Sequence, residues 1–181
     1  PPVIGKLTKL THLGLGENQF TKLPPEIGHL TNLIWLYLEG NQLSTLPPEI
    51  GQLTNLTGLS LRGIHFTALP SEIGNLTKLV FLKLGENQFT MLPPEIGKLT
   101  NLTWLYLEGN QLTTLPPEIK KLTKLTELQI ERNPLTDEGL EHLKSLKSLK
   151  RLNLCETRIT KTGVGSFKKA LPNCEIEVLR K

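Results

Sequence analysis

Long hydrophobic runs are absent from this chain of 181 residues, and cysteines and aromatic residues are scarce. No stretch approaches the roughly 20 apolar residues that a membrane-spanning helix needs, so we expect no membrane span. The first residues lack the charged and then apolar order of a secretory signal segment. The two cysteines, Cys155 and Cys174, do not form the dense disulfide pattern of small extracellular domains. We therefore expect a cytoplasmic location.

Groups of residues that carry catalysis are also missing. The sequence contains no glycine-rich loop of the phosphate-binding type. The histidines fall at unrelated positions of the repeat described below, without the regular spacing of metal ligands: His12, His29, His65 and His142. We predict no catalytic residue, no metal site and no cofactor, and we expect neither an enzyme nor a small-molecule substrate.

The positive charge is concentrated in one part of the chain. Residues 1–119 contain seven Lys or Arg and nine Asp or Glu, whereas residues 120–181 contain fourteen and eight. These basic residues fall mainly on segments that we expect to be helical, where a solvated outer face explains them. No aromatic residues are interleaved with them, which disfavours nucleic acid as a partner.

One leucine pattern fills the chain. Its copies begin at Leu7, Leu30, Leu53, Leu76, Leu99, Leu122 and Leu146, with intervals of 23 residues until the last, which is 24. A unit of this length cannot bury its apolar side alone, so the units stack into a solenoid. We predict one domain over residues 1–181, with half a repeat at 1–6 and a cap at about 171–181. Residues 1–6 match the end of a complete repeat, so we interpret the chain as a fragment.

Each repeat predicts a short strand followed by a turn. In the repeat that begins at Leu30, Leu36 and Leu38 flank Tyr37, the alternation of a half-buried strand, and such strands stack into a parallel sheet. An asparagine after each strand can satisfy backbone groups of the turn. This predicts an asparagine ladder of Asn18, Asn41, Asn87, Asn110 and Asn133. The third repeat has Ile64 instead, so we expect residues 63–65 to be locally different and less well held.

The return path of each repeat changes character along the chain. The Leu-Pro-Pro-Glu-Ile-Gly phrase, as at Leu46 to Gly51, favours an extended path. After Leu135 this phrase disappears, and residues 136–143 and 160–171 have helical spacing behind an N-terminal threonine. The predicted fold is an α/β solenoid, a right-handed superhelix with a concave parallel sheet. Its convex side is predicted to be extended in the first five repeats and helical in the last two.

The segments TNLIWLYLEGNQLSTLPPEIGQL and TNLTWLYLEGNQLTTLPPEIKKL resemble the 23-residue class of leucine-rich repeats found in bacterial proteins and in intracellular Ras-suppressor proteins. The final units resemble the helical repeats that end many bacterial arrays, which favours a bacterial source. The resemblance covers almost the whole chain. It implies a non-catalytic protein-interaction domain that holds a protein or peptide on its concave sheet and adjoining loops.

Both tryptophans and both tyrosines lie on the outward side of the predicted strands. Such side chains are enriched at binding hot spots, so we expect the concave face to be the binding surface. The predicted partner-binding residues are His12, Trp35, Tyr37, Arg62, Phe81, Lys83, Trp104, Tyr106, Glu127 and Gln129.

Between the two aromatic groups, Gly58 and Ser60 predict a notch. Along one rim, glutamates exceed the cations Arg62, Lys83 and Arg132; these glutamates are Glu17, Glu39, Glu86, Glu108 and Glu131. A partner with an apolar anchor and basic flanks would suit this face.

A duplicated block explains part of this pattern. The repeats from Leu30 and Leu99 agree at 19 of 23 positions, and those from Leu7 and Leu76 at 18 of 23. Duplication alone would copy Trp35 and Tyr37 without selection for binding. However, the second pair differs at His12 against Phe81 and at Gly14 against Lys83, on the predicted face.

Two other functions stay open. One alternative is that the chain is the targeting arm of a larger signalling or effector enzyme. The other is that it is a structural spacer without a specific ligand. We expect a monomer that can associate through its N-terminal edge.

Overall fold

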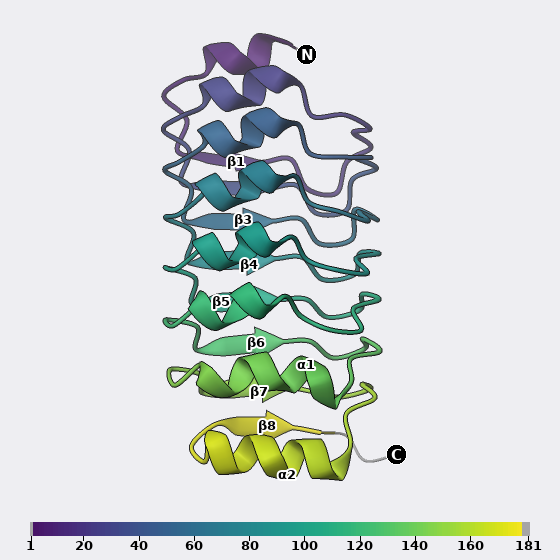
Figure 1. Ribbon diagram of the computed structural model, residues 1–181. Helices are drawn as coiled ribbons and strands as arrows, with labels where there is room; N and C mark the ends of the chain where they lie inside the picture. Colours follow the sequence, from purple (N-terminus) through teal and green to yellow (C-terminus); the bar gives the residue numbers. More distant parts are fainter. Residues whose placement is uncertain (1, 179–181) are drawn as a thin grey trace.

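The structure is a computed structural model that describes residues 2–178. Within this range, eight short parallel strands form one sheet in chain order (Figure 1). The strands are β1 (His12–Gly14), β2 (Trp35–Tyr37), β3 (Gly58–Ser60), β4 (Phe81–Lys83), β5 (Trp104–Tyr106), β6 (Glu127–Gln129), β7 (Arg151–Asn153) and β8 (Glu175–Glu177). The predicted solenoid with a parallel sheet is confirmed.

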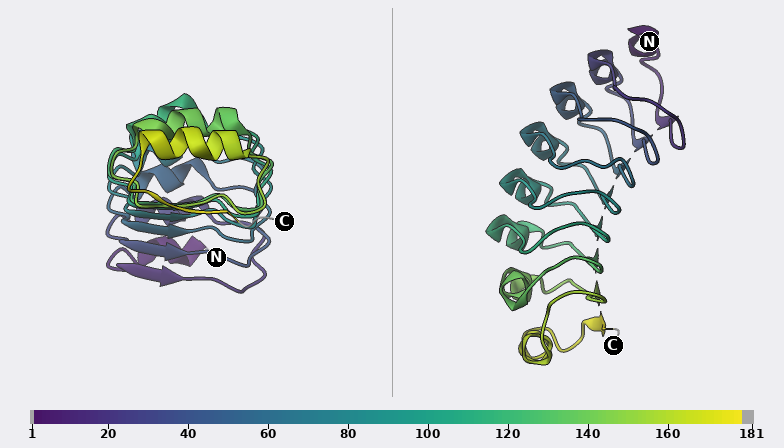
Figure 2. Two further views of the ribbon diagram at one scale, coloured as in Figure 1. Left: turned by 90° about the horizontal axis from the view of Figure 1, so that it is seen from below. Right: turned by 90° about the vertical axis from the view of Figure 1, so that its right-hand side faces the viewer.

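Neighbouring strands pair in register because the repeat length is nearly constant. Leu36 pairs with Leu59 and Leu59 with Leu82, and all three are fully buried. The coils follow an arc, with the sheet on its concave side and the helices on its convex side (Figure 2). Since side chains alternate along a strand, the first and third residues of each strand face the concave side.

The convex side contains short 3₁₀ helices, so the prediction that it is extended is wrong. They are η1 (Pro2–Lys6), η2 (Pro25–His29), η3 (Pro48–Gln52), η4 (Ser71–Asn75), η5 (Pro94–Lys98) and η6 (Pro117–Lys121). In η3, Pro47 is extended, with φ −68° and ψ 146°, and Pro48 begins the helix. A proline is tolerated there because the first N–H groups of a helix have no partner within it. Ile50 then plugs the core and is fully buried.

The last two repeats are helical on the convex side, as predicted. They contain α1 (Asp137–Glu141) followed by η7 (His142–Ser145), and then α2 (Lys161–Ala170). The Thr160 hydroxyl caps α2 by accepting the Gly163 N–H at 3.1 Å, whereas the Thr136 side chain makes no such bond to α1. Thr160 also donates its N–H and hydroxyl to Asp137 at 2.8 and 2.6 Å, which lowers the pKa of Asp137. These bonds join the two helical repeats.

The predicted asparagine ladder is present at four of its five positions, whereas Asn18 is exposed and donates to carbonyls of its own repeat. Asn87 Nδ2 donates to the carbonyls of Leu61, Leu84 and Gly85 at 2.8, 2.9 and 3.1 Å. Its Oδ1 accepts the Phe66 N–H at 2.9 Å. The same pattern links successive repeats at Asn41, Asn110 and Asn133. Each buried amide therefore serves the backbone of two repeats.

The interruption of the ladder at Ile64 is only partly as expected. His65 has a φ of 64°, whereas the equivalent residues of the neighbouring repeats, Gln42 and Gln88, do not have positive φ, so this loop does differ locally. Ile64, however, is 1% exposed, and its N–H donates to Asn87 Oδ1 at 3.2 Å. Burial and this bond place Ile64 in the core, and whether the loop is less well held stays a prediction.

The N-terminal edge of the sheet leaves apolar side chains uncovered. Leu7 is 48% exposed and Phe20 is 39% exposed, whereas Leu30 and Leu43, at the same positions of the next repeat, are 0% and 2% exposed. Association through this edge stays a prediction. Among the residues that the structure describes, no helix is long and apolar enough to cross a membrane.

Replacing Asn87 with alanine tests the ladder. Asn87→Ala leaves several buried backbone groups without partners, at about 1–3 kcal/mol for each unsatisfied group, so we expect a loss of at least about 2 kcal/mol in the free energy of unfolding. The control is Asn18→Ala, because Asn18 is exposed and donates to carbonyls of its own repeat. Urea denaturation followed by circular dichroism measures both, and equal losses would contradict a stabilising ladder.

Candidate functional site

Aromatic side chains from three strands form one continuous surface on the concave face. Trp35 and Tyr37 of β2 stack with ring centroids 5.7 Å apart and an interplanar angle of 12°. Trp35 also contacts Phe81 of β4 at 5.8 Å, and Phe81 meets Tyr106 of β5 edge to face at 5.4 Å. These four residues are the aromatic cluster. It extends from β2 to β5 and crosses the intervening strand β3.

The notch predicted at Gly58 is filled, so this prediction is wrong at that position. A Cβ atom on Gly58 would lie 2.0 Å from Cε3 of Trp35. The indole therefore occupies the space that a larger residue on β3 would take, and this brings it into contact with Phe81. The glycine joins the two predicted aromatic groups instead of separating them.

Two further predicted residues extend the concave surface. Trp104, on β5, is 38% exposed. His12, on β1, is also exposed, and its Nδ1 lies 3.0 Å from the Thr11 hydroxyl. Both occupy the first position of their strands, in the same row as Trp35 and Phe81.

Glu127 and Gln129, also predicted as binding residues, hold Tyr106 in place. Glu127 is 7% exposed, and its Oε1 accepts hydrogen bonds from the Tyr106 hydroxyl and from Gln129 Nε2, both at 3.0 Å. Arg151 pairs with the other oxygen of Glu127. Burial raises the pKa of Tyr106, and the bond to Glu127 raises it further. This network orients one end of the aromatic cluster.

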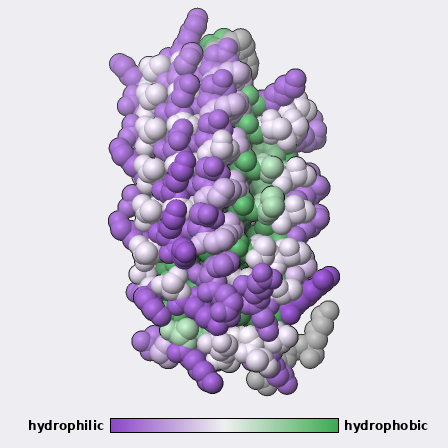
Figure 3. All heavy atoms as spheres, in the orientation of Figure 1, coloured by the Kyte–Doolittle hydropathy of each residue, from purple (hydrophilic) through white to green (hydrophobic). Residues whose placement is uncertain are grey.

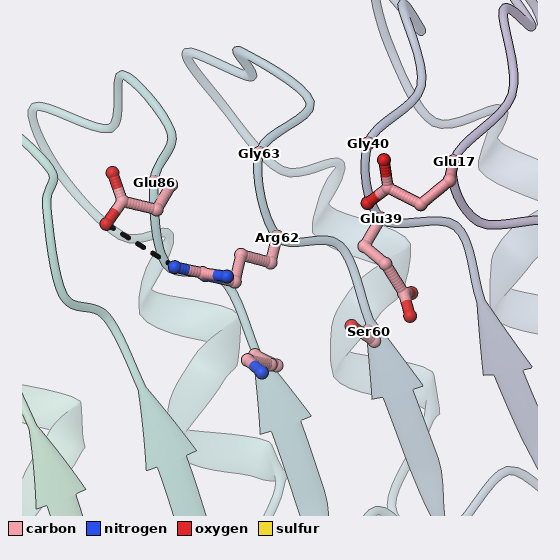
Figure 4. Close-up of a pocket in the computed structure, with 8 residues that line it drawn as sticks. Glu17, Glu39, Gly40, Ser60, Arg62, Gly63 and Glu86 are labelled. Atoms are coloured by element: carbon pink, nitrogen blue, oxygen red, sulfur yellow. Dashed lines mark ion pairs between the residues drawn. The ribbon is translucent and has the colours of Figure 1, made fainter.

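A hollow of about 480 Å³ lies beside the aromatic cluster, close to where strands β1 to β4 end (Figure 4). It is lined by Glu17, Glu39, Gly40, Ser60, Arg62, Gly63, Lys83 and Glu86. We name it the Ser60 hollow. Ser60 is paired in the sheet with Tyr37 on one side and Lys83 on the other, so the hollow adjoins the aromatic cluster. Arg62 and Lys83, two predicted binding residues, come together here.

Glycine and glutamate alternate where the chain leaves the strands. A Cβ atom on Gly40 would lie 2.5 Å from Glu17 Oε1, and one on Gly16 would lie 3.1 Å from Glu39 Cδ. The same pair of contacts is found between two later repeats, where Glu86 lies against Gly109 and Glu108 lies against Gly85. Each of these glutamates therefore lies against a glycine of the neighbouring repeat, where an added side chain would require the glutamate to shift.

Arg62 belongs to one side of the Ser60 hollow. Its guanidinium lies 3.7 Å from Glu86 and 3.5 Å from Glu108. Figure 4 shows the side chain directed toward Glu86, with Glu17 and Glu39 on the opposite side of the hollow. Arg132 pairs with Glu86 as well. The cations thus compensate the carboxylates of the later repeats.

Three carboxylates along this rim are partly desolvated. Among the described residues, the Oε2 atoms of Glu39, Glu108 and Glu131 are buried and have no hydrogen-bond partner. Burial raises the pKa of Glu131, and the charge of Glu108 contributes to the increase. Buried acceptors without donors are unfavourable in the isolated protein.

Sequence reasoning placed these glutamates on a rim without assigning a site to Glu17, Glu39 or Glu86. The alternation of Gly-Glu with Glu-Gly in successive repeats was the pattern that could have revealed how close they lie.

The opposite face of the molecule has a different character. Figure 3 shows the convex side covered mainly by hydrophilic side chains, with a narrow hydrophobic band along its length. Within residues 2–178, no three His, Cys, Asp or Glu side chains form a group that could hold a metal ion.

Gly58→Ala tests whether the position of the Trp35 indole depends on the absence of a side chain at Gly58. The added methyl group displaces the indole, and we expect a loss of about 1–3 kcal/mol in unfolding free energy, as for other overpacking substitutions. Gly14→Ala is the control, because a Cβ there has nothing within 4 Å, and it should change stability by about 0.5 kcal/mol or less. Urea denaturation followed by circular dichroism compares them. An equal response of both variants would show that Trp35 does not depend on Gly58.

Glu131→Gln tests the strain on the rim. The folded state raises the pKa of Glu131, so its ionised form destabilises the fold above that pKa, and the penalty is absent below the ordinary glutamate pKa of about 4.3. We expect the variant to have a higher Tm than the wild type at pH 7, with the difference vanishing below about pH 4. The control Glu138→Gln changes an exposed glutamate of α1. A lower Tm at pH 7 would contradict the assignment.

Comparison with known proteins agrees with the repeat geometry. The family model for the leucine-rich repeat region matches residues 2–84 and 71–170. A leucine-rich repeat protein of Leptospira interrogans has a similar structure, with a TM-score of 0.91 and 42% identity over 98% of this chain and 45% of its own. The internalin inlF of Listeria monocytogenes is similar with a TM-score of 0.86 and 26% identity, over 99% of this chain and 50% of its own.

This chain thus spans about half the length of both solved structures. Among curated proteins, no sequence matches it significantly. The in-register sheet, the asparagine ladder and the match of the family model over most of the chain place it together with these bacterial proteins: the chain belongs to the leucine-rich repeat family.

Proposed function

We propose that this chain is a non-catalytic binding domain whose concave face recognises a protein or peptide through the aromatic cluster and Trp104. The observation that carries this proposal is the continuous contact from Tyr37 through Trp35 and Phe81 to Tyr106. Partly exposed aromatic rings that are already packed lose little conformational freedom on binding, and such residues dominate hot spots.

The dimensions of the surface favour a polypeptide ligand. The aromatic cluster extends across three strand intervals, about 14 Å at 4.8 Å per strand. A surface of this length suits several consecutive side chains of a peptide or a projecting loop. Repeat solenoids commonly use their extended concave surfaces in this way.

The divergence of the duplicated repeats also supports binding. The leucine framework is the same in the repeats from Leu7 and Leu76, but His12 and Gly14 in the first correspond to Phe81 and Lys83 in the second. Phe81 connects Trp35 with Tyr106, and Lys83 lines the Ser60 hollow. Both differences change the face while the core is unchanged, a pattern that favours binding over a structural spacer.

The setting of the binding domain is also a proposal. Service as the targeting arm of a larger signalling or effector enzyme is compatible with the same face, which would then select the substrate. We propose the cytoplasm as the compartment, because the chain has few cysteines and both are buried thiols.

Selection of peptides on the purified chain tests the proposed function. Twelve-residue random peptides displayed on phage are selected on the wild-type protein, and calorimetry then compares their affinities for variants. We expect Trp35→Ala and Phe81→Ala each to weaken binding by at least about 30-fold, the effect of a hot-spot loss of 2 kcal/mol.

Met91→Ala is the matched control, because Met91 is 70% exposed and lies outside the strands. It should leave both affinity and Tm unchanged. Peptides whose binding survives both aromatic substitutions, in proteins that keep their circular dichroism, would overturn the proposed function.

A further inference from the structure

The two sides of the Ser60 hollow differ in charge compensation. On one side, Arg62 lies close to both Glu86 and Glu108. On the other side, Glu17 and Glu39 lie together, and Arg62 points away from them (Figure 4). On one side of the hollow, Arg62 therefore compensates the charge of glutamates, whereas the other side presents the two carboxylates of Glu17 and Glu39.

Glu39 provides an independent sign that a donor is missing. Its Oε2 is buried and has no hydrogen-bond partner within the described residues. The Glu39 side chain lies against Gly16, and the Glu17 side chain lies against Gly40. A cationic donor that enters the hollow gives the Glu39 carboxylate a charge-assisted partner.

The hollow lies at the side of the aromatic cluster. Ser60, which lines the hollow, is the sheet partner of Tyr37, and adjacent parallel strands lie about 4.8 Å apart. One ligand can therefore place an apolar side chain on the rings and a neighbouring polar side chain in the hollow. Its volume of about 480 Å³ is sufficient for a long side chain.

We propose that the ligand is a basic and apolar peptide segment that inserts an arginine or lysine side chain between Glu17 and Glu39 while its apolar residues pack on the aromatic cluster. This rests on the proposed function and names the chemistry of its partner. Arg62 is already paired with carboxylates, which leaves Lys83 as the one cation against Glu17 and Glu39 among the residues lining the hollow. An acidic ligand would bring a third negative charge against these two carboxylates.

The test compares two pairs of neutral substitutions. Glu17→Gln with Glu39→Gln removes the two charges and keeps the side-chain size, so the reciprocal packing on Gly40 and Gly16 is preserved. Glu26→Gln with Glu49→Gln makes the same change in net charge on η2 and η3 of the convex side. A third variant, Glu17→Lys, changes an exposed residue and reverses its charge without altering the partly buried Glu39.

The probes are the phage-selected peptides and synthetic copies of them. We expect the selected pool to be enriched in arginine or lysine next to aromatic or aliphatic residues and depleted in Asp and Glu. A synthetic peptide from this pool should bind the Glu17→Gln, Glu39→Gln protein at least tenfold more weakly, and Glu17→Lys as well, whereas the convex variant keeps the wild-type affinity. Replacing the basic residue of the peptide with glutamine should cause no further loss in the Glu17→Gln, Glu39→Gln protein.

The outcomes separate this inference from the proposed function. Peptides that need Trp35 and Phe81 but carry no enriched basic residue, or that bind the Glu17→Gln, Glu39→Gln protein as tightly as the wild type, would overturn the inference and leave the proposed function standing. A pool without any peptide that depends on Trp35 and Phe81 would overturn both.

Discussion

The nearly constant length of the repeat is the constraint on which the rest of this structure depends. Equivalent positions are 23 residues apart from β1 to β6 and 24 apart from β6 to β8, where the convex side is helical. Every described strand therefore meets its neighbour without a shift, and a residue on one strand lies beside its counterpart on the next. The buried leucines form one continuous core in this way. The same register aligns the buried asparagines, so each amide can reach carbonyls in two repeats. The register that aligns the core therefore also aligns the side chains of the concave face in rows.

Register explains why much of the fold was predictable from sequence. The strands, their parallel order, the asparagine ladder and the change to helices after Leu135 all follow from spacing and from residue type. The 3₁₀ helices were missed because the proline pair was interpreted as one unit. In the structure the two prolines have different roles, since Pro47 is extended and Pro48 begins a helix. This difference depends on the position of each proline relative to the helix, and a rule based on the presence of two prolines does not predict it.

The sequence predicted which residues of the candidate site face the concave side, but it did not predict which of them are in contact. Sequence placed Trp35, Phe81 and Tyr106 on one face, and the structure adds that they touch. Gly58 was interpreted as an empty position because side-chain size is visible in a sequence, whereas the direction of a neighbouring indole is not. The hollow beside Ser60 depends likewise on rotamers of Glu39 and Arg62. Such directions result from packing between repeats, which a single repeat considered alone does not specify.

The contacts between glutamates and glycines of neighbouring repeats have a consequence for how this array can evolve. Most core positions are leucine in every repeat from Leu30 to Lys121, so the core there distinguishes little between one unit and the next. The strand exits differ more, since four glutamates each lie against a glycine of an adjacent unit, the next one for Glu17 and Glu86 and the preceding one for Glu39 and Glu108. Glu108 and Glu131 occupy the same position in adjacent repeats, and the pKa of Glu131 is raised by burial first and by the charge of Glu108 in addition. Recombination that copies several adjacent units together preserves the pairs, whereas exchange of single units breaks them.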